Sequence, residues 1–498
     1  MPKFGASSKQ SQIFSKQALR IVVCSGKSLA AMTIPAVEQL DQLSREELLA
    51  LVKELLLIVS QQQQRIAELE AEIAKLRQPP PTSSNSSQPP SRDQKANQPE
   101  KKKRKKHGPP KGHPKYERPL VDNPDQVVVA SVAECEHCHA DLRGVEPDEI
   151  VKRQITEIPP VKPVVIETQQ HKTTCPHCQQ INRGALPKGL EEDRCFGPNL
   201  EASVIYYKHP QHLSYERVVE TMRELHGVTL SEGALVAILK RGGQKAQPVA
   251  EAIKEQVISS TVVKSDETSA RVKGRNWWQW VFLSDAGVYH TIVPTRSAAE
   301  IEAVMGSLCV EIWVCDCFSS QLKAPAKVFQ LCLAHQLRDL QKVIDIAPDQ
   351  LWAHDMHKLF QDAIHLRNRF VDGEMTLGGF SRRVTEIENK LDRLLEETPG
   401  NEAGRKLQAR YVKHRDKLLT FLQYPEVPPT NNESERALRP SVVHRKVTNG
   451  FRSEWGAKAY AAIQTVIATA KLKGDEVFQA LVNLMGTPVL PFLEGSSP

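Results

Sequence analysis

The segment Ser260-Thr-Val-Val-Lys-Ser-Asp-Glu-Thr268 decides the fold, because it predicts a β-strand that delivers a carboxylate. The β-branched run Ser260–Lys264 favours a strand, and Asp266 follows two residues after its end. Trp277–Leu283 and Gly287–Val293 have the same apolar and aromatic character and are predicted to be the second and third strands. Together the three segments predict an antiparallel meander whose first strand ends in an acid.

A second acid follows a later strand. A helix is predicted over Ser297–Leu308, then a strand over Glu311–Cys315 that leads into Asp316, and then a strand over Val328–Cys332 with a helix after it. This order, β-β-β-α-β-α-β with Asp on the first and fourth strands, is typical of the ribonuclease H-like arrangement, in which those two strands are neighbours. Asp266 and Asp316 are therefore expected to lie close together. Carboxylates that share a site select a hard cation, Mg²⁺ or Mn²⁺.

A third acid is predicted on a helix that opens with Thr430-Asn-Asn-Glu-Ser-Glu-Arg-Ala-Leu-Arg-Pro440. Glu435 and Glu433 are both candidates to complete a two-metal site with the two aspartates. Arg436 and Arg439 lie within one turn of Glu435 and are candidate donors to DNA phosphates. Surface salt bridging is the alternative role for both arginines.

Helices fill the long gap between the second and third acids. The segments Leu351–Phe370, Leu377–Leu395 and Asn401–Leu422 are all strongly helical in pattern, which predicts a helical insertion. A further amphipathic helical pair is expected over Trp455–Leu484.

Two CxxC pairs, Cys135-Glu-His-Cys138 and Cys175-Pro-His-Cys178, predict a zinc ribbon with four thiolate ligands. Between the pairs, Arg153–Pro159 and Val161–Glu167 are predicted to form the strands of a hairpin. The alternatives are no metal, or a mixed site in which a nearby histidine replaces one sulfur: His137, His139, His171 or His177.

An unbroken heptad register precedes this module and predicts a parallel two-stranded coiled coil. Its seam positions alternate in steps of four and three: Leu48, Val52, Leu55, Val59, Gln62, Ile66, Leu69, Ile73 and Leu76. A homodimer or higher oligomer is therefore expected. The alternative is an amphipathic helix that folds onto its own domain.

A helix-turn-helix is predicted after the zinc ribbon. The helices Tyr215–Leu225 and Ser231–Leu239 are separated by a turn that contains Gly227. Whether this pair reads DNA or serves as plain scaffold stays open at this stage.

The net charge of +7 is concentrated in one tract of the 498-residue chain. Between Lys95 and Lys115 there are nine Lys or Arg and one Glu. Such a tract favours a polyanion partner, with a solvated linker as the alternative. The candidate DNA-binding residues within it are Lys101, Lys102, Lys103, Arg104, Lys105 and Lys106. Without a membrane-length apolar run or a secretory signal, the protein is expected to be cytoplasmic and to have no membrane partner.

The segments "SDET", "CDCFS", "CLAHQLRDL" and "NNESERALRP", together with the CxxC pairs, resemble the insertion-sequence sixty-six family of DDE transposases, the large transposases of bacterial insertion sequences. The resemblance implies Asp266, Asp316 and Glu435 as the catalytic, Mg²⁺-binding acids, with Glu433 the lesser candidate. It also implies DNA partners (element ends and target), accessory element-encoded proteins and a nucleoid-associated location.

The expected architecture is multidomain α+β. The domains are 1–39 unassigned, 40–77 coiled coil, 78–130 basic disordered linker, 131–185 zinc ribbon with structural Zn²⁺, 195–245 helical DNA-binding region, 255–344 ribonuclease H-like core, 345–425 helical insertion, 426–452 helix with the third acid, and 453–498 C-terminal helices. The expected activity is metal-dependent DNA cleavage and strand transfer. The alternatives are a Mg²⁺-dependent structure-specific nuclease and a non-catalytic zinc-ribbon DNA-binding regulator.

Overall fold

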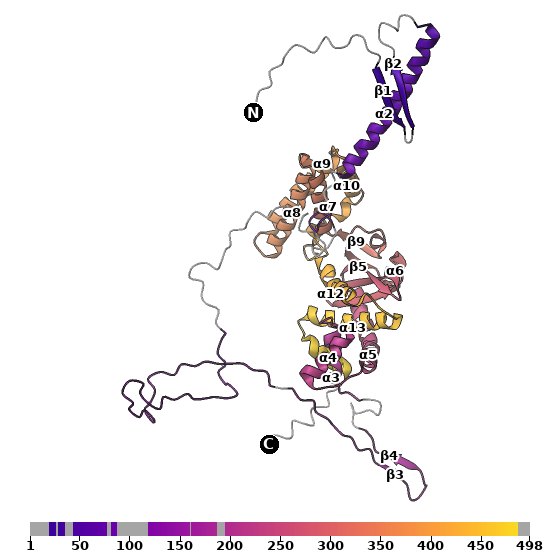
Figure 1. The fold of residues 1–498 in the computed structure, drawn as a ribbon. Helices are drawn as coiled ribbons and strands as arrows, with labels where there is room; N and C mark the ends of the chain where they lie inside the picture. Colours follow the sequence, from indigo (N-terminus) through magenta and orange to yellow (C-terminus); the bar gives the residue numbers. More distant parts are fainter. Residues whose placement is uncertain are drawn as a thin grey trace. The chain divides into compact units, whose positions relative to one another are not determined.

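A computed structural model gives the fold of the chain (Figure 1). It describes residues 19–25, 28–34, 43–76, 81–86, 118–159, 161–186 and 195–486. The chain divides into two compact units, Met1–Pro81 and Thr82–Pro498.

The first unit contains a hairpin and a long helix. Strands β1 (Leu19–Ser25) and β2 (Ser28–Ile34) pair antiparallel, and α2 covers Arg45–Leu76. The helix opens with a capping box, in which Ser44 and Glu47 each accept from the other's backbone N–H, at 3.3 and 2.8 Å. The helix confirms the helical period of the heptads. The hairpin was not predicted, because its apolar run lacks the alternation that marks a half-buried strand.

A five-stranded sheet with the order β7-β6-β5-β8-β9 organises the second unit. Strands β5 (Val262–Val272), β6 (Arg275–Ser284) and β7 (Gly287–Val293) form the predicted antiparallel meander. Strands β8 (Val310–Cys315) and β9 (Ala326–Leu331) continue the sheet in parallel with β5. The predicted strands and their order are confirmed in outline.

Two details of this prediction were wrong. Strand β5 does not end before Asp266 but continues to Val272, because it pairs with the whole of β6. Between the fourth and fifth strands the chain forms a 3₁₀ turn, η3 (Gln321–Lys323), in place of an α-helix. The predicted helix after the meander is present as α6 (Ala298–Met305).

Both faces of the sheet are covered. Alternate residues of β6 point to opposite sides, so Trp280 and Phe282 join the main core while Val281 and Leu283 pack with Leu438 on the other side. Leu438 belongs to α12 (Asn432–Thr448).

Helix α13 (Glu454–Lys473) covers the edge strand β7. The hydroxyls of Thr469 and Thr465 accept from the backbone N–H groups of Val288 and His290, at 3.1 and 2.9 Å. These bonds satisfy donors that a free sheet edge would expose.

Close packing holds α13 against α5 (Glu232–Ile258). A Cβ atom added at Gly243 of α5 would lie 2.3 Å from the Cβ of Ala459, so this position requires glycine. The two helices lie against each other, below the sheet in the view of Figure 1.

The predicted helix pair before the sheet is confirmed. Helix α3 (Pro198–Lys208) leads to α4 (Tyr215–His226), and α5 follows. Ser214 and Ser231 cap α4 and α5, and Gly227 ends α4 in the left-handed conformation. The second helix of the pair is much longer than predicted, since it runs on to Ile258.

The helical insertion follows α7 (Leu333–Ile346). Its helices are α8 (Leu351–Val371), α9 (Leu377–Glu396), α10 (Glu402–Lys413) and α11 (Thr420–Gln423), with the 3₁₀ turn η4 (Arg415–Lys417) before α11.

The prediction of one helix over Asn401–Leu422 was wrong. Leu418, Leu419, Phe421 and Leu422 are all buried, and a single straight helix cannot bury so many adjacent positions on one side. The C-terminal pair is confirmed as α13 and α14 (Val477–Met485).

The predicted strands Arg153–Pro159 and Val161–Glu167 were wrong, because the chain has no regular structure there. Prolines at 159 and 163 remove backbone donors that a strand needs. The strands of this region are β3 (Lys172–Thr174) and β4 (Ile181–Arg183), which form a short antiparallel hairpin on either side of the second CxxC pair.

Part of the predicted disordered linker is ordered. The turn formed by 82–86 buries Asn85, whose side-chain amide donates to Asp345 at the end of α7. Within the described ranges, no helix combines the length and the apolar character that a membrane crossing requires.

Candidate active site

The parallel register of β5 and β8 sets Asp266 and Asp316 at the same level of the sheet. Lys264 is paired with Val314, and each aspartate lies two residues further along its strand direction. Asp316 follows the last residue of β8, and its carboxylate accepts the backbone N–H of Phe318 at 3.0 Å. The expected proximity of the two aspartates therefore follows directly from the pairing of these strands.

The start of α12 brings the third acid to the same edge. The Asn431 side chain donates to the carbonyl of Ser265, next to Asp266, at 2.7 Å, and its backbone N–H donates to the Cys332 sulfur at 3.1 Å. The backbone N–H of Glu435 donates to the carbonyl of Asn431 at 3.2 Å. Asn431 is almost fully buried, so it ties the first turn of α12 to β5.

The neighbouring acids act on Asp266 electrostatically. Burial raises the pKa of Asp266 well above its ordinary value, and the negative charges of Glu267, Asp316 and Glu435 raise it further. Like charges at close range disfavour ionisation. A divalent cation between the carboxylates would reverse this effect.

Glu267, next to Asp266 in the chain, has partners of its own. The Arg296 guanidinium donates to one oxygen of Glu267 at 2.8 and 2.5 Å, and the Gln321 amide donates to the other at 2.6 Å. Arg296 also lies over the rings of Phe318 and Trp278, at 3.6 and 4.7 Å from the ring centroids. This network orders the backbone on both sides of Asp266 and Asp316.

Glu435 faces positive and polar groups of α7. Arg338 donates to its carboxylate at 2.9 Å, and His335 Nε2 lies 3.6 Å from the same oxygen. Burial lowers the pKa of His335, and the nearby Arg338 lowers it further. The neutral imidazole is therefore favoured beside Glu435.

Glu433, the other acid of this turn, has a different partner. Its carboxylate accepts from the buried Lys264 ammonium at 2.5 Å, and Glu433 lies two residues before Glu435 on the same turn of α12. Of the two candidates, Glu435 is the one whose charge acts on Asp266.

The donor set of Asp266, Asp316 and Glu435 fits a hard divalent cation, because all three offer carboxylate oxygens. Within the part of the chain that the structure describes, no three His, Cys, Asp or Glu side chains lie close enough to form a metal-holding group. The acids are thus near neighbours, but not a closed ligand shell.

The candidate DNA-binding arginines lie beside this edge. Arg436 and Arg439 are exposed on α12, and neither pairs with an acid among the described residues. The predicted DNA-binding tract 101–106 lies outside the described residues.

The two CxxC pairs form matching turns. In each turn, the backbone N–H of the first Cys donates to the backbone carbonyl of the residue five positions later. The backbone carbonyl of the same Cys accepts from the backbone N–H of the residue four positions later, and all of these distances are 2.8–3.0 Å. The residues that follow the second Cys, His139 and Gln179, both have left-handed φ values, 60° and 58°.

The same backbone geometry prepares the sulfurs for metal. Backbone N–H groups of Cys138 and His137 donate toward Cys135 and lower the pKa of its thiol, and Cys178 and His177 act likewise on Cys175. Thiolate is the form that binds zinc. Each turn fits a zinc knuckle with two sulfur ligands.

Sequence reasoning missed the residues that support the acids: Arg296, Gln321, Arg338 and Asn431. Their partners are distant in the chain, so spacing could not reveal them. A weak signal existed for Arg338, which lies one helical turn after His335 on the same face.

Three family models match stretches of the chain. A family model described as "Transposase IS66 family" matches residues 194–459, just over half of the chain. A model of the "zinc-finger binding domain of transposase IS66" matches residues 133–179, and a family of unknown function matches residues 32–119.

Two uncharacterized proteins of Sinorhizobium fredii (strain NBRC 101917 / NGR234) are similar to this chain. Protein y4hP is 24% identical over 389 residues, which cover 70% of this chain and 69% of that protein. Protein y4qI is 24% identical over 371 residues, 67% of this chain and 68% of the relative.

Among solved structures, the chain is similar to one in the crystal structure of the Mos1 strand transfer complex. The identity is 14% and the TM-score 0.11, and the match covers 28% of this chain and 54% of the other. The chain thus spans about half the length of that solved protein.

The family matches define a transposase, an enzyme class that moves DNA segments. In particular, the chain belongs to the IS66 family of transposases. The resemblance seen in its motifs is thereby confirmed, and its zinc-finger region is the one that carries both CxxC pairs.

Proposed function

We propose that this transposase cuts DNA at the ends of its element and joins them to target DNA at a divalent-metal centre held by Asp266, Asp316 and Glu435. The proposal includes a ribonuclease H-like catalytic core, formed by the sheet β7-β6-β5-β8-β9 and its helices. The observation that supports it is the pairing of β5 with β8 and the tie of α12 to β5 through Asn431, which bring the three acids to one edge of the sheet. Burial, and then the charges of the neighbouring acids, raise the pKa of Asp266 there.

The acids have distinct supports in this proposal. Asp266 and Asp316 are fixed by the sheet, and Glu435 is oriented by Arg338 on α7. A bound pair of Mg²⁺ or Mn²⁺ ions would supply Lewis acidity to the attacking and leaving oxygens of the phosphodiester. Arg436 and Arg439, exposed on the same helix, contact the DNA backbone.

The CxxC turns bind structural zinc in the same proposal. Cys135, Cys138, Cys175 and Cys178 are its ligands, and the site holds the region 131–185 in a form that binds DNA.

The long helix α2 pairs with a second copy of the chain. Four of its seam residues, Val52, Val59, Ile66 and Leu69, are exposed, with Val52 at 50% and Ile66 at 53% of their free surface. Apolar seams of this length are stable when two helices bury them against each other. Ile66→Asp is expected to convert dimers to monomers in analytical ultracentrifugation, and a dimer that persists would remove α2 from the interface.

One assay tests the catalytic proposal. Protein, Mg²⁺, labelled element ends and a plasmid target are incubated together, and joined product is the expected result. Nicked ends without joining would indicate a nuclease, and shifted but intact DNA a regulator. Both outcomes would contradict the proposal.

The third acid has a matched control on the same turn of α12. Glu435→Gln is expected to abolish product while DNA binding is retained, whereas Glu433→Gln retains most activity because Glu433 faces Lys264. The reverse pattern would assign the third position to Glu433.

A further inference from the structure

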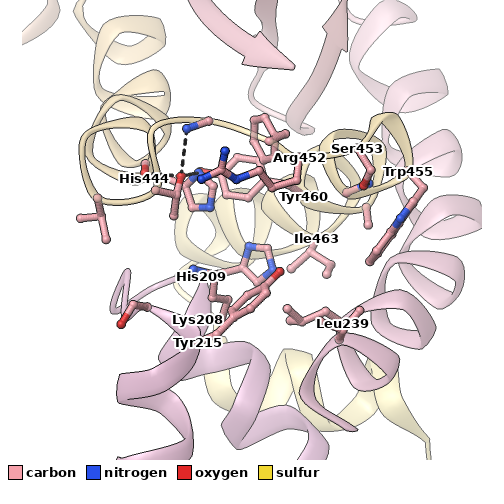
Figure 2. A pocket seen from close by; sticks show the side chains of 18 of the residues that line it. Lys208, His209, Tyr215, Leu239, His444, Arg452, Ser453, Trp455, Tyr460 and Ile463 are labelled. Atoms are coloured by element: carbon pink, nitrogen blue, oxygen red, sulfur yellow. Dashed lines mark hydrogen bonds between the residues drawn. The ribbon is translucent and has the colours of Figure 1, made fainter. Parts of the chain in front are cut away.

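A cavity of about 630 Å³ lies away from the three acids, between the helices that precede the sheet and the two that follow it. Figure 2 shows Lys208, His209 and Tyr215 on one side of it and His444, Arg452 and Tyr460 on the other. Its volume is within the range of pockets that hold small organic groups, about 300–1,000 Å³.

Aromatic rings form much of the wall. Tyr215, Phe451, Trp455 and Tyr460 all line the cavity. Tyr460 is buried, but Trp455 is 42% exposed, which is unusual for so large an apolar side chain. Aromatic side chains at a cavity stack on nucleobases, because every base has a π-face.

Buried polar groups are available to an occupant. The Lys208 ammonium is 5% exposed and donates to the carbonyl of Leu213 at 2.9 Å, which leaves further donors on the same nitrogen. His209 is equally buried, and its Nδ1 has no hydrogen-bond partner among the described residues. An unpaired buried donor or acceptor costs free energy unless an occupant satisfies it.

The charges at the cavity favour a neutral ring over a free anion. Lys208 and the exposed Arg452 are opposed by two exposed acids, Glu216 and Glu232. Burial lowers the pKa of His444 to about 3, so this wall residue is neutral. A nucleobase carries no charge and offers hydrogen-bonding edges, and its backbone phosphate can remain outside near Arg452.

The cavity is rigidly linked to the candidate active site. Helix α12 carries Glu435 near its start and His444 nine residues later, about 13 Å along the helix axis. The loop after α12 is tied to β5, since Phe451 exchanges backbone hydrogen bonds with Arg271 and Lys273 at 2.7 and 2.9 Å. Gly450 is required there, because a Cβ atom would lie 2.5 Å from the Arg271 carbonyl oxygen.

We propose that this cavity holds one unpaired nucleobase of the DNA strand on which the active site acts, stacked on Trp455. The inference rests on the proposed function for its substrate.

The test measures binding of the full chain to three labelled DNAs by fluorescence anisotropy, without Mg²⁺. The DNAs are a blunt duplex, the same duplex with a short thymidine tail, and the same tail with abasic sites. Trp455→Ala is expected to weaken binding of the thymidine-tailed duplex by about tenfold and to leave the other two unchanged. Trp455→Phe should retain most of the affinity, because the stacking face remains.

A matched control is Phe478→Ala, which removes an aromatic ring of similar exposure, 40%, outside the cavity. It should change none of the three affinities. The inference is overturned if Trp455→Ala weakens all three DNAs equally, or none of them. It is also overturned if free thymidine monophosphate displaces the tailed duplex at concentrations near the dissociation constant of that duplex, since the cavity would then be a mononucleotide site.

The failure of this inference is distinguishable from failure of the proposed function. The Asp316→Asn variant should keep the preference for the thymidine tail although it forms no joined product. Suppose that the wild type forms joined product but Trp455→Ala does not change binding of the tailed duplex. The proposed function would then stand, and only the proposal of a base-binding cavity would be rejected.

Discussion

Two sets of side chains in this protein are positioned in opposite ways: the three acids at the sheet edge and the sulfurs of the CxxC turns. Asp266, Asp316 and Glu435 come from positions up to 169 residues apart and are brought together by strand pairing and by Asn431. Each CxxC turn instead arranges its two sulfurs with backbone hydrogen bonds inside a six-residue segment. The acids therefore depend on the global fold, whereas each pair of sulfurs depends on local conformation.

This difference also separates the energetics of the two regions. The acids are half-buried, and burial together with the neighbouring negative charges raises the pKa of Asp266, so the folded protein holds unfavourable charge there. The CxxC turns are largely exposed, and metal binding is expected to supply most of the free energy that orders them. Each prediction below tests one side of this contrast.

The largest effect is expected from neutralising an acid. Asp266→Asn should lower strand-transfer activity on the order of a thousandfold or more, because a metal ligand is lost. The same change should leave the free energy of unfolding unchanged or raise it, since it removes a buried charge beside Asp316 and Glu435. Activity assays and urea unfolding measure both. Full activity, or a marked loss of stability, would contradict the picture of a strained acidic site.

Removing a thiolate should have the opposite profile. Cys135→Ser is expected to reduce the zinc content of the protein and to weaken DNA binding. The thermal midpoint of the five-stranded sheet and its helices should stay unchanged. Metal analysis and calorimetry provide the measurements. A large fall in the midpoint would show that the two regions are not independent in stability. Cys309→Ser, an exposed cysteine outside both turns, is the matched control.

Breaking the support of Glu267 should destabilise the acid edge. Arg296→Met leaves the buried carboxylate of Glu267 with only Gln321, and the expected loss is about 2–3 kcal/mol of unfolding free energy. Arg275→Met changes an exposed arginine on the neighbouring strand β6 and should cost less than about 0.5 kcal/mol. Equal effects of the two changes would argue against the network.

The smallest expected effect, counted per residue and per pH unit, is on the pH dependence of stability. Burial lowers the pKa values of His290 and His444 to about 3, from 6.5 for the free side chain. As the pH falls below 6.5, these histidines become protonated in the unfolded chain but stay neutral in the folded chain. The free energy of unfolding should therefore fall by about 1.4 kcal/mol per pH unit for each histidine. Above pH 6.5 this contribution is fully present.

The measurement is the urea midpoint between pH 7 and 5. It is best made in the Asp266→Asn background, because the raised pKa of Asp266 gives a contribution of opposite sign. His290→Gln should reduce the slope, and His365→Gln, at an exposed position, should not. A flat profile would contradict burial of the two neutral imidazoles.

The parts of the fold that sequence reasoning predicted are those with a local signal. The β-branched and aromatic runs around Asp266 predict the meander, and the caps Ser214 and Ser231 mark two helix starts. The prediction of strands within 153–167 was wrong because apolar alternation alone does not make a strand. The prolines of this segment lack the backbone N–H groups that pair neighbouring strands. The single helix over 401–422 misled because tertiary burial of Leu418 and Leu419 overrides helical propensity.

For the candidate site, motif spacing was sufficient to nominate the acids but not their supports. Acids follow strands, and strands have sequence signatures. Arg296 and Gln321 become relevant only through the packing of α6 and η3 near β5, which no spacing encodes. The cavity beside Trp455 is likewise invisible in sequence, because its walls come from residues more than 200 positions apart.

The contact between Gly243 and Ala459 sets a narrow limit on how this chain can vary. A single methyl group added at position 243 would have to push α13 outward, and α13 supplies the hydroxyls that cover β7. Uncovering that strand would expose its amide groups to strands of other molecules. Glycine at position 243 thereby keeps α13 close enough to cover β7.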